Sequence, residues 1–238
     1  GDWRVLKMKK IGLLCPSDTE LAPFLPCIEG RSRSQAAMLE VWEGELWGFP
    51  AAALYSGVCK VNAAVAAQIL ISQYQADAVI LSGVAGGLDE SVRVLDTVIP
   101  EQCAYHDVSP DILTEFHPWI PSVWFPADPQ LLDAARRAGQ KAGFPVKFGS
   151  LVTGEQFIEE GERRRLREEF SPLAVDMETA AAAHVCYVNK TPFLAVRTIT
   201  DTEQEDGQEN FELNCEQAAA RAKDMVRLIL EEWKNGIH

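Results

Sequence analysis

Short, continuous apolar runs alternate with longer segments of helical periodicity along most of the chain. Such runs are typical of strands that are buried on both faces of a sheet. We expect these strands at residues 10–15, 78–81, 173–175 and 192–199, and a further strand at residues 145–153. The helical pattern recurs at residues 61–74, 128–142, 163–170, 179–188 and 211–233. Strands that alternate with helices predict an α/β fold, with a sheet that is covered by helices.

The remaining segments have weaker patterns. Residues 37–44 and 45–56 are predicted to be two strands joined by a tight connection, with a second turn at 48–50. Residues 108–126 show no periodicity, yet they hold the large apolar residues Ile112, Phe116, Trp119, Ile120, Trp124 and Phe125. A cluster of this kind covers a site, forms a subunit interface or folds onto its own domain.

Length and charge limit the classes of protein. The 238 residues suit one α/β domain, which we place at residues 8–238, with residues 1–7 as an N-terminal extension or a cloning remnant. The formal charge of −13 repels phosphate backbones and anionic lipid surfaces. We therefore expect neither nucleic acid nor a membrane as a partner.

Cysteine and histidine spacing offers no metal site. The six cysteines, at positions 15, 27, 59, 103, 186 and 215, form no C-x-x-C pair, and the four histidines have no ligand spacing. The cysteines are expected to be reduced thiols of a cytoplasmic protein. No motif calls for a cofactor, so we expect neither a metal nor a cofactor.

Acidic residues stand where predicted strands end. Glu178 follows the strand at 173–175, Asp201 ends the segment after 192–199, and Glu20 begins the helix that leaves the first strand. Ligands of open α/β sheets bind outside the carboxyl ends of the strands, where two carboxylates can divide acid and stabilising roles. A simpler interpretation is that these residues favour helix N-termini and a turn. The local pattern leaves both interpretations open.

A glycine-rich segment, SGVAGGL at residues 82–88, follows a predicted strand directly. Glycines at this point let the backbone come close to a ligand. The segment lacks the dinucleotide fingerprint and the Walker lysine. We therefore expect a loop that suits a neutral ligand with hydroxyls better than a pyrophosphate.

Seven stretches occur together in one order: KIGLL followed by Glu20, SGVCKVNAA, SGVAGGL, YHDV, VTGEQFI, VDMETAAAAHVC and AVRTITD. In these motifs, from about residue 10 to 235, the chain resembles the 5′-methylthioadenosine/S-adenosylhomocysteine nucleosidases of the purine nucleoside phosphorylase and uridine phosphorylase superfamily. The resemblance implies an αβα sandwich around a mixed, partly closed sheet, and a homodimer. It also implies hydrolysis of an N-glycosidic bond, which releases adenine and a 5′-thio-substituted ribose.

The resemblance implies catalytic roles for three carboxylates. Glu20 matches the residue that activates the attacking water, and Asp201 matches the acid that gives a proton to adenine N7. Glu178 matches the residue that grips the sugar hydroxyls. Asp201 can donate only when it is protonated, so we expect burial or neighbouring acids that favour this form.

Substrate-binding roles are implied in the same way. Phe157 matches the aromatic residue that stacks on the purine, and Ile158 matches the residue whose backbone contacts the adenine edge. Met177 accompanies Glu178 at the ribose, Arg197 lies near the water, and Phe211 lines the ribose and alkylthio side. Further pocket-lining residues are expected to be Val58, Val84 and Gly86.

Four positions depart from the family pattern. Val84 replaces a serine near the water, Cys59 replaces a glycine, Asp176 replaces a glutamate and Glu155 replaces an aspartate. These departures leave the preferred 5′ substituent open. The alternatives are a sister nucleosidase such as futalosine hydrolase, a phosphorylase, and a nucleoside-binding protein without catalysis.

Water is the expected nucleophile, because the SGVAGGL segment carries no cation to hold a phosphate dianion. A carboxylate at Glu20 would repel phosphate at short range. Three basic residues, Arg31, Arg33 and Lys60, could alter this expectation, because the sequence does not place them relative to the site.

Overall fold

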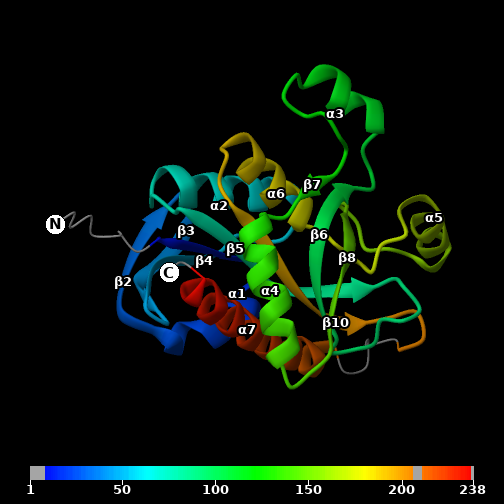
Figure 1. Ribbon diagram of the computed structural model, residues 1–238. Helices are drawn as coiled ribbons and strands as arrows, with labels where there is room; N and C mark the ends of the chain where they lie inside the picture. Colours follow the sequence, from blue (N-terminus) through cyan, green and yellow to red (C-terminus); the bar gives the residue numbers. More distant parts are fainter. Residues whose placement is uncertain (1–8, 206–210, 237–238) are drawn as a thin grey trace.

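The computed structural model describes residues 9–205 and 211–236. The proposed N-terminal extension, residues 1–7, lies outside the described residues. Strands of the described part form one mixed sheet (Figure 1). Its strands are β1 (Ile11–Cys15), β2 (Ile28–Ala36), β3 (Leu39–Leu46), β4 (Phe49–Tyr55), β5 (Ala78–Gly87), β6 (Thr97–Tyr105), β7 (Phe125–Pro126), β8 (Val146–Thr153), β9 (Ala174–Asp176) and β10 (Phe193–Asp201).

Strand β5 is the branch point of the sheet. Its first half pairs with β1 on one edge, and most of its other edge pairs with β10, in both cases in parallel. At its end, Gly86 and Gly87 pair with β9 in antiparallel register. Because β9 continues through β8 and β6 back to β10, these five strands close into a ring, while β1, β4, β3 and β2 extend as an open arm. The predicted mixed, partly closed sheet is therefore confirmed.

Helices cover both faces of the sheet (Figure 1). One face packs against α4 (Pro129–Lys141), α7 (Phe211–Asn235) and the short 3₁₀ helix η1 (Ala22–Cys27), and the other packs against α2 (Lys60–Ser72) and α6 (Thr179–Val188). The predicted inner face of α7, formed by Ala218, Ala222, Met225 and Ile229, is fully buried. Because helices pack on both faces of the sheet, the strands between them are buried on both faces. This burial explains why short apolar runs predicted the sheet well.

The predicted strands at 37–44 and 45–56 are wrong in their boundaries. Strand β3 runs straight through residues 44 and 45, and the turns lie at 37–38 and 47–48, where Ala37, Met38, Trp47 and Gly48 all have positive φ. Strand β2, which precedes them, was not predicted. Most of its side chains are exposed, so it lacks the apolar alternation by which a strand is recognised.

The predicted loop at 82–88 is also wrong for most of its length. Residues 82–87 continue β5, because Gly83 and Gly86 pair with Arg197 and Asp201 of β10. Residues 108–126 are not wholly irregular, since they contain the helix α3 (Pro110–Phe116) and β7. The remaining helices are α1 (Asp18–Leu21) and α5 (Glu160–Phe170).

Candidate active site

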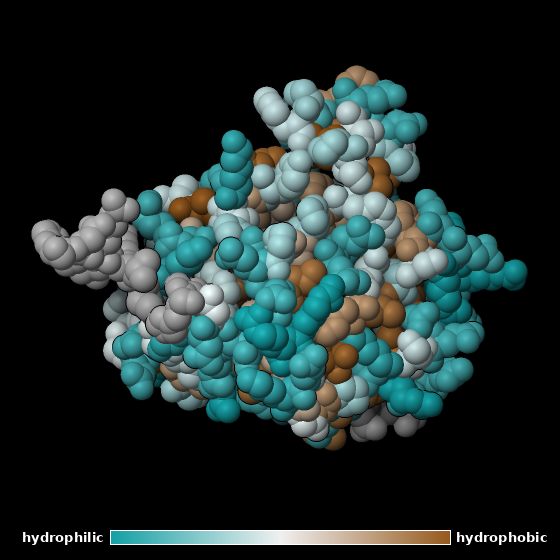
Figure 2. Space-filling model, viewed as in Figure 1, coloured by the Kyte–Doolittle hydropathy of each residue, from teal (hydrophilic) through white to brown (hydrophobic). Residues whose placement is uncertain are grey.

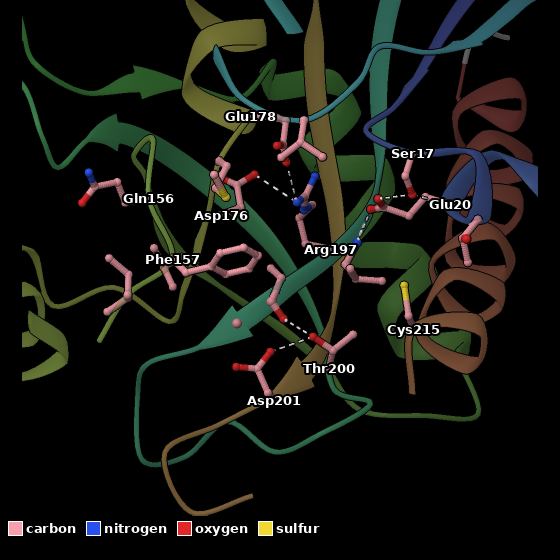
Figure 3. Close-up of a pocket in the computed structure, with 18 of the residues that line it drawn as sticks. Ser17, Glu20, Gln156, Phe157, Asp176, Glu178, Arg197, Thr200, Asp201 and Cys215 are labelled. Atoms are coloured by element: carbon pink, nitrogen blue, oxygen red, sulfur yellow. Dashed lines mark hydrogen bonds and ion pairs between the residues drawn. The ribbon is translucent and has the colours of Figure 1, made fainter. Parts of the chain in front are cut away.

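A pocket of about 410 Å³ opens at the carboxyl ends of β5, β9 and β10 (Figure 3). The predicted site residues that line it are Glu20, Val58, Val84, Gly86, Phe157, Ile158, Met177, Glu178, Arg197 and Asp201. The side chain of Phe211, the remaining predicted residue, lies outside the described part of the structure. The fold thus brings together residues that are separated by up to 181 positions in the sequence (201 − 20).

Glu20 is held at both of its carboxylate oxygens. Oε2 accepts a hydrogen bond from the backbone N–H of Val84 at 2.7 Å, and Oε1 accepts one from the Ser17 hydroxyl at 2.8 Å. Ser17 is also the N-cap of α1, which fixes the first turn that carries Glu20. Burial raises the pKa of Glu20, although Arg197 and these two donors oppose the rise. A buried carboxylate with a raised pKa is a stronger base for water than an exposed glutamate.

Gly83 allows Glu20 to take this position. A Cβ atom at residue 83 would overlap Oε2 of Glu20. The glycine in the middle of β5 therefore serves a close approach of a side chain to the strand backbone. The predicted close approach of a ligand to these glycines stays a prediction, because the neighbour that Gly83 admits is the side chain of Glu20.

Glu178, Asp176 and Arg197 form a buried ion-pair cluster. NH2 of Arg197 lies 3.2 Å from Oε1 of Glu178 and 3.3 Å from Oδ2 of Asp176, and all three side chains are nearly inaccessible to solvent. The second oxygen of Glu178 accepts the backbone N–H of Cys59 at 2.9 Å. Burial raises the pKa of Glu178 to about 7, against the opposing effect of Arg197.

Arg197 keeps donors for a further partner. Within the described residues, its Nε and NH1 atoms are buried and have no hydrogen-bond partner. Buried donors are normally satisfied, so an acceptor in the pocket, such as a water or a sugar oxygen, is expected to fill this role. The position lies beside Glu20 and Glu178 in Figure 3.

Asp201 ends β10 on the pocket wall. Its Oδ1 accepts the Thr200 hydroxyl at 2.8 Å, and its Oδ2 lies 3.4 Å from NH2 of Arg163. The side chain is about one-third exposed. We expected burial or neighbouring acids around Asp201, but the side chain is partly exposed and these contacts are to a hydroxyl and a guanidinium.

The loop after β8 is tied to the loop before α2. Glu155 accepts the backbone N–H of Lys60 at 2.7 Å and donates its own N–H to Asp107 at 3.0 Å, while Lys60 pairs with Asp107 through its side chain. Lys60 is thus occupied by an acid outside the pocket lining. Phe157 projects from the same loop and is 83% exposed. Its ring is therefore accessible for stacking on a planar group.

Comparisons with known proteins identify the family of the chain. Residues 10–231 match the family described as the phosphorylase superfamily. The chain belongs to this superfamily. It is 33% identical over 227 residues to a 5′-methylthioadenosine/S-adenosylhomocysteine nucleosidase of Actinobacillus succinogenes, with 94% of this chain and 99% of the relative covered.

Solved structures of the superfamily show the same fold. The nucleosidase of Neisseria meningitidis in complex with methylthio-immucillin-A matches with a TM-score of 0.85 and 32% identity, over 94% of this chain and 99% of that one. A futalosine hydrolase of Helicobacter pylori matches with a TM-score of 0.84 and 25% identity, over 94% and 98% of the two chains.

Two departures from the family pattern have a structural consequence. Cys59 has a φ of 84°, a conformation that favours glycine, and it holds this strained geometry where its N–H meets Glu178. Asp176 accepts hydrogen bonds from Thr153 at 2.6 Å and from the Thr179 backbone at 2.9 Å. Its role is therefore to anchor β9 and α6 and to balance the charge of Arg197.

Ser17, Arg163 and Cys215 line the pocket as well, although we did not predict them from the sequence. Ser17 lies three residues before Glu20, so a helix-capping pattern could have identified it. Arg163 stands in a run of three arginines, in which no pattern distinguishes the inward one.

In residues 9–205 and 211–236, no group of three or more His, Cys, Asp or Glu side chains is placed to hold a metal ion. Over the same residues, no helix has the length and apolarity that a bilayer crossing requires.

Proposed function

We propose that this protein hydrolyses the N-glycosidic bond of 5′-methylthioadenosine and S-adenosylhomocysteine. The products are adenine and the 5′-thio-substituted ribose. One observation carries the proposal: Glu20, Glu178 and Asp201, from three separate parts of the chain, line one pocket that also holds Arg197. The named activities of the relatives at about one-third identity support it.

Glu20 activates the attacking water in this proposal. Water at the Arg197 donors would lie next to the carboxylate, which removes a proton as the oxygen approaches C1′ of the sugar. The two hydrogen bonds to Glu20 hold the carboxylate in one orientation, so little reorganisation is needed during the reaction.

Glu178 binds the ribose hydroxyls, with Met177 beside them. Positive charge develops on the sugar as the glycosidic bond breaks, and a buried carboxylate stabilises this charge strongly. Arg197 and the Cys59 N–H keep Glu178 directed toward the pocket. Phe211 is proposed to cover the sugar and the alkylthio group, with Val58 and Val84 as apolar neighbours.

Asp201 donates a proton to the departing base. Negative charge gathers on the purine, and a proton donated to N7 relieves it. Phe157 stacks on the ring, and the backbone of Ile158 contacts the adenine edge, while Gly86 leaves room beside Asp201. In this proposal the purine shares the Asp201 carboxyl with Arg163, which makes one contact with Oδ2.

Incubation of the purified protein with a set of nucleosides tests the proposal. The set comprises methylthioadenosine, S-adenosylhomocysteine and adenosine, with chromatography of the released bases. Adenine should appear from both thio-substituted nucleosides. Release of no base from either of them would refute the proposed function.

We further propose that the protein is a homodimer in which residues 111–121 contact the partner. The helix α3 projects from the body in Figure 1, and Figure 2 shows hydrophobic atoms on this projection. Ile112, Phe116 and Trp119 are 53%, 79% and 71% exposed, which is costly for a monomer. Ile120, which we expected to join them, is buried in its own chain.

A cytoplasmic location is also proposed. The six cysteines at positions 15, 27, 59, 103, 186 and 215 are free thiols. Free and partly buried thiols are typical of proteins in a reducing compartment.

A further inference from the structure

Arg163 places a guanidinium at the purine end of the pocket. It lies in the first turn of α5, which packs at the right-hand edge of the molecule in Figure 1. Its NH1 donates to the carbonyl oxygen of Gly87 at 3.0 Å, and its NH2 lies 3.4 Å from Oδ2 of Asp201. The two arginines that follow it, Arg164 and Arg165, instead pair with glutamates of the same helix.

The position of Arg163 is held by the fold. Only 14% of its side chain is exposed, against 84% for Arg164. Arg167, one helical turn further on, faces the same way and donates to the carbonyl oxygen of Leu88 at 2.7 Å. The carbonyl oxygens of Gly87, the last residue of β5, and of Leu88, the next residue, thus accept hydrogen bonds from two arginines on one face of α5. These hydrogen bonds hold the helix beside Asp201.

A guanidinium recognises one type of purine edge. It has five N–H donors and no acceptor, and the contacts above use two of these donors. An adenine presents the acceptor N7 and the donor N6 on its major-groove edge, whereas a 6-oxopurine presents two acceptors, N7 and O6. Arginine that donates to N7 and O6 together is the commonest specific contact to guanine in protein–DNA complexes.

We propose that Arg163 is a specificity-determining residue that lets the pocket cleave 6-oxopurine nucleosides in addition to adenine nucleosides. The proposal rests on the proposed function, because it assumes that the purine edge faces Asp201. Asp201 supplies oxygen acceptors for the 6-amino group, and Arg163, beside it, supplies donors for the 6-oxo group. Each type of purine edge therefore finds a partner at the same position.

The reaction balances for both bases, but the proton of the departing purine comes from Asp201 for adenine and from solvent for a 6-oxopurine. The C1′–N9 bond breaks and its electron pair moves to the purine, while the water oxygen bonds to C1′ and one water proton passes to Glu20. With a 6-oxopurine, the negative charge spreads to N7 and O6, where the guanidinium stabilises it without giving up a proton. The purine then takes up a proton from solvent, and Glu20 releases the one it received.

A comparison of the cleavage of two nucleosides tests the inference. The unaltered protein, Arg163→Met and the control Arg164→Met are assayed with 5′-methylthioadenosine and with its 6-oxo counterpart, 5′-methylthioinosine. The unaltered protein and the control should cleave both. Arg163→Met keeps the apolar stem and loses the donors, so its kcat/KM for methylthioinosine should fall by roughly 10- to 100-fold. Its kcat/KM for methylthioadenosine should fall much less.

The outcomes separate the inference from the proposed function. Cleavage of methylthioadenosine alone by the unaltered protein, or an unchanged ratio of the two kcat/KM values in Arg163→Met, would overturn the inference. If the unaltered protein cleaves neither nucleoside, the proposed function is overturned instead. Binding of free hypoxanthine and free adenine to the unaltered protein, measured by calorimetry, needs no variant. Both should bind with Kd values within about tenfold, and binding of adenine alone would contradict the role of Arg163.

Discussion

Replacement of Glu178 by glutamine should stabilise the protein at alkaline pH while it removes activity. The side chain is only 3% exposed, and its pKa is raised from 4.5 to about 7, mainly by burial. Below pH 4.5 the carboxyl is neutral in both the folded and the unfolded chain, so it costs no ionisation energy. As the pH rises through 7, the folded protein must hold a buried charge that the unfolded chain exposes to water, and stability is lost.

The size of the effect follows from the shift in pKa. A difference of about 2.5 units, at 1.36 kcal/mol per unit, corresponds to about 3 kcal/mol at pH values well above 7. Glutamine avoids this cost, but its NH2 group must face either the Cys59 N–H or Arg197, both of which are donors. This mismatch costs about 1 kcal/mol. The net gain of about 2 kcal/mol should raise Tm by roughly 4–8 °C for a chain of this length.

Thermal unfolding of Glu178→Gln and of the unaltered protein should be compared from pH 4.5 to 9 at one fixed protein concentration. A matched control is Glu90→Gln, because Glu90 is exposed and outside the pocket. The difference in Tm should be near zero or slightly negative at the acidic end and should grow between pH 5 and 8. A difference that does not depend on pH would refute the argument that Glu178 carries a costly buried charge.

Three further predictions concern catalysis and assembly. Glu20→Gln and Asp201→Asn should each lower kcat by roughly 10²- to 10⁴-fold with nucleoside binding largely retained, and wild-type rates in either variant would count against their roles. Loss of the Ser17 hydroxyl in Ser17→Ala should raise the pKa of Glu20 further and move the acidic limb of the pH profile of kcat/KM to higher pH. Ser17→Thr should restore the original profile, and identical pH profiles of Ser17→Ala and the unaltered protein would contradict a positioning role. Sedimentation should show a dimer that Phe116→Ser with Trp119→Ser converts to a monomer, and a monomeric unaltered protein with full activity would rule out the proposed interface.

The sequence predicted the central part of the fold because its strands are buried on both faces. The runs that became β1 and β10 are predominantly apolar and buried, and each was placed within two residues of its observed ends. The acidic residues at strand ends could also be identified, because parallel strands bring their carboxyl ends to one edge. Asp201 follows this rule, because β10 is parallel to β5. Glu178 follows β9, which is antiparallel to β5, so the rule does not explain its place in the pocket.

The parts that were missed depend on backbone pairing and on side-chain direction. Strand β2 is held by its hydrogen bonds to β3, and its exposed side chains show no apolar period. Residues 82–87 look like a loop because of their glycines, yet they pair along β10. Arg163 points into the pocket while Arg164 points to solvent, a choice that depends on how α5 docks against β5.

The nature of the nucleophile is the most direct test of the account. The cations that line the pocket are Arg197, which is paired with Asp176 and Glu178, and Arg163, which is paired with Asp201. Arg31, Arg33 and Lys60 are not among the lining residues, and Arg33 and Lys60 pair with Glu40 and Asp107. Among residues 9–205 and 211–236, a phosphate dianion would therefore meet Glu20 without an unpaired cation in the pocket lining, whereas a water molecule can be polarised there.

The decisive measurement is the release of adenine from methylthioadenosine in phosphate-free buffer, with the sugar product identified by chromatography. We predict full activity without phosphate and free methylthioribose as the product, with no change when phosphate is added. A strict requirement for phosphate, with a sugar 1-phosphate as the product, would contradict it.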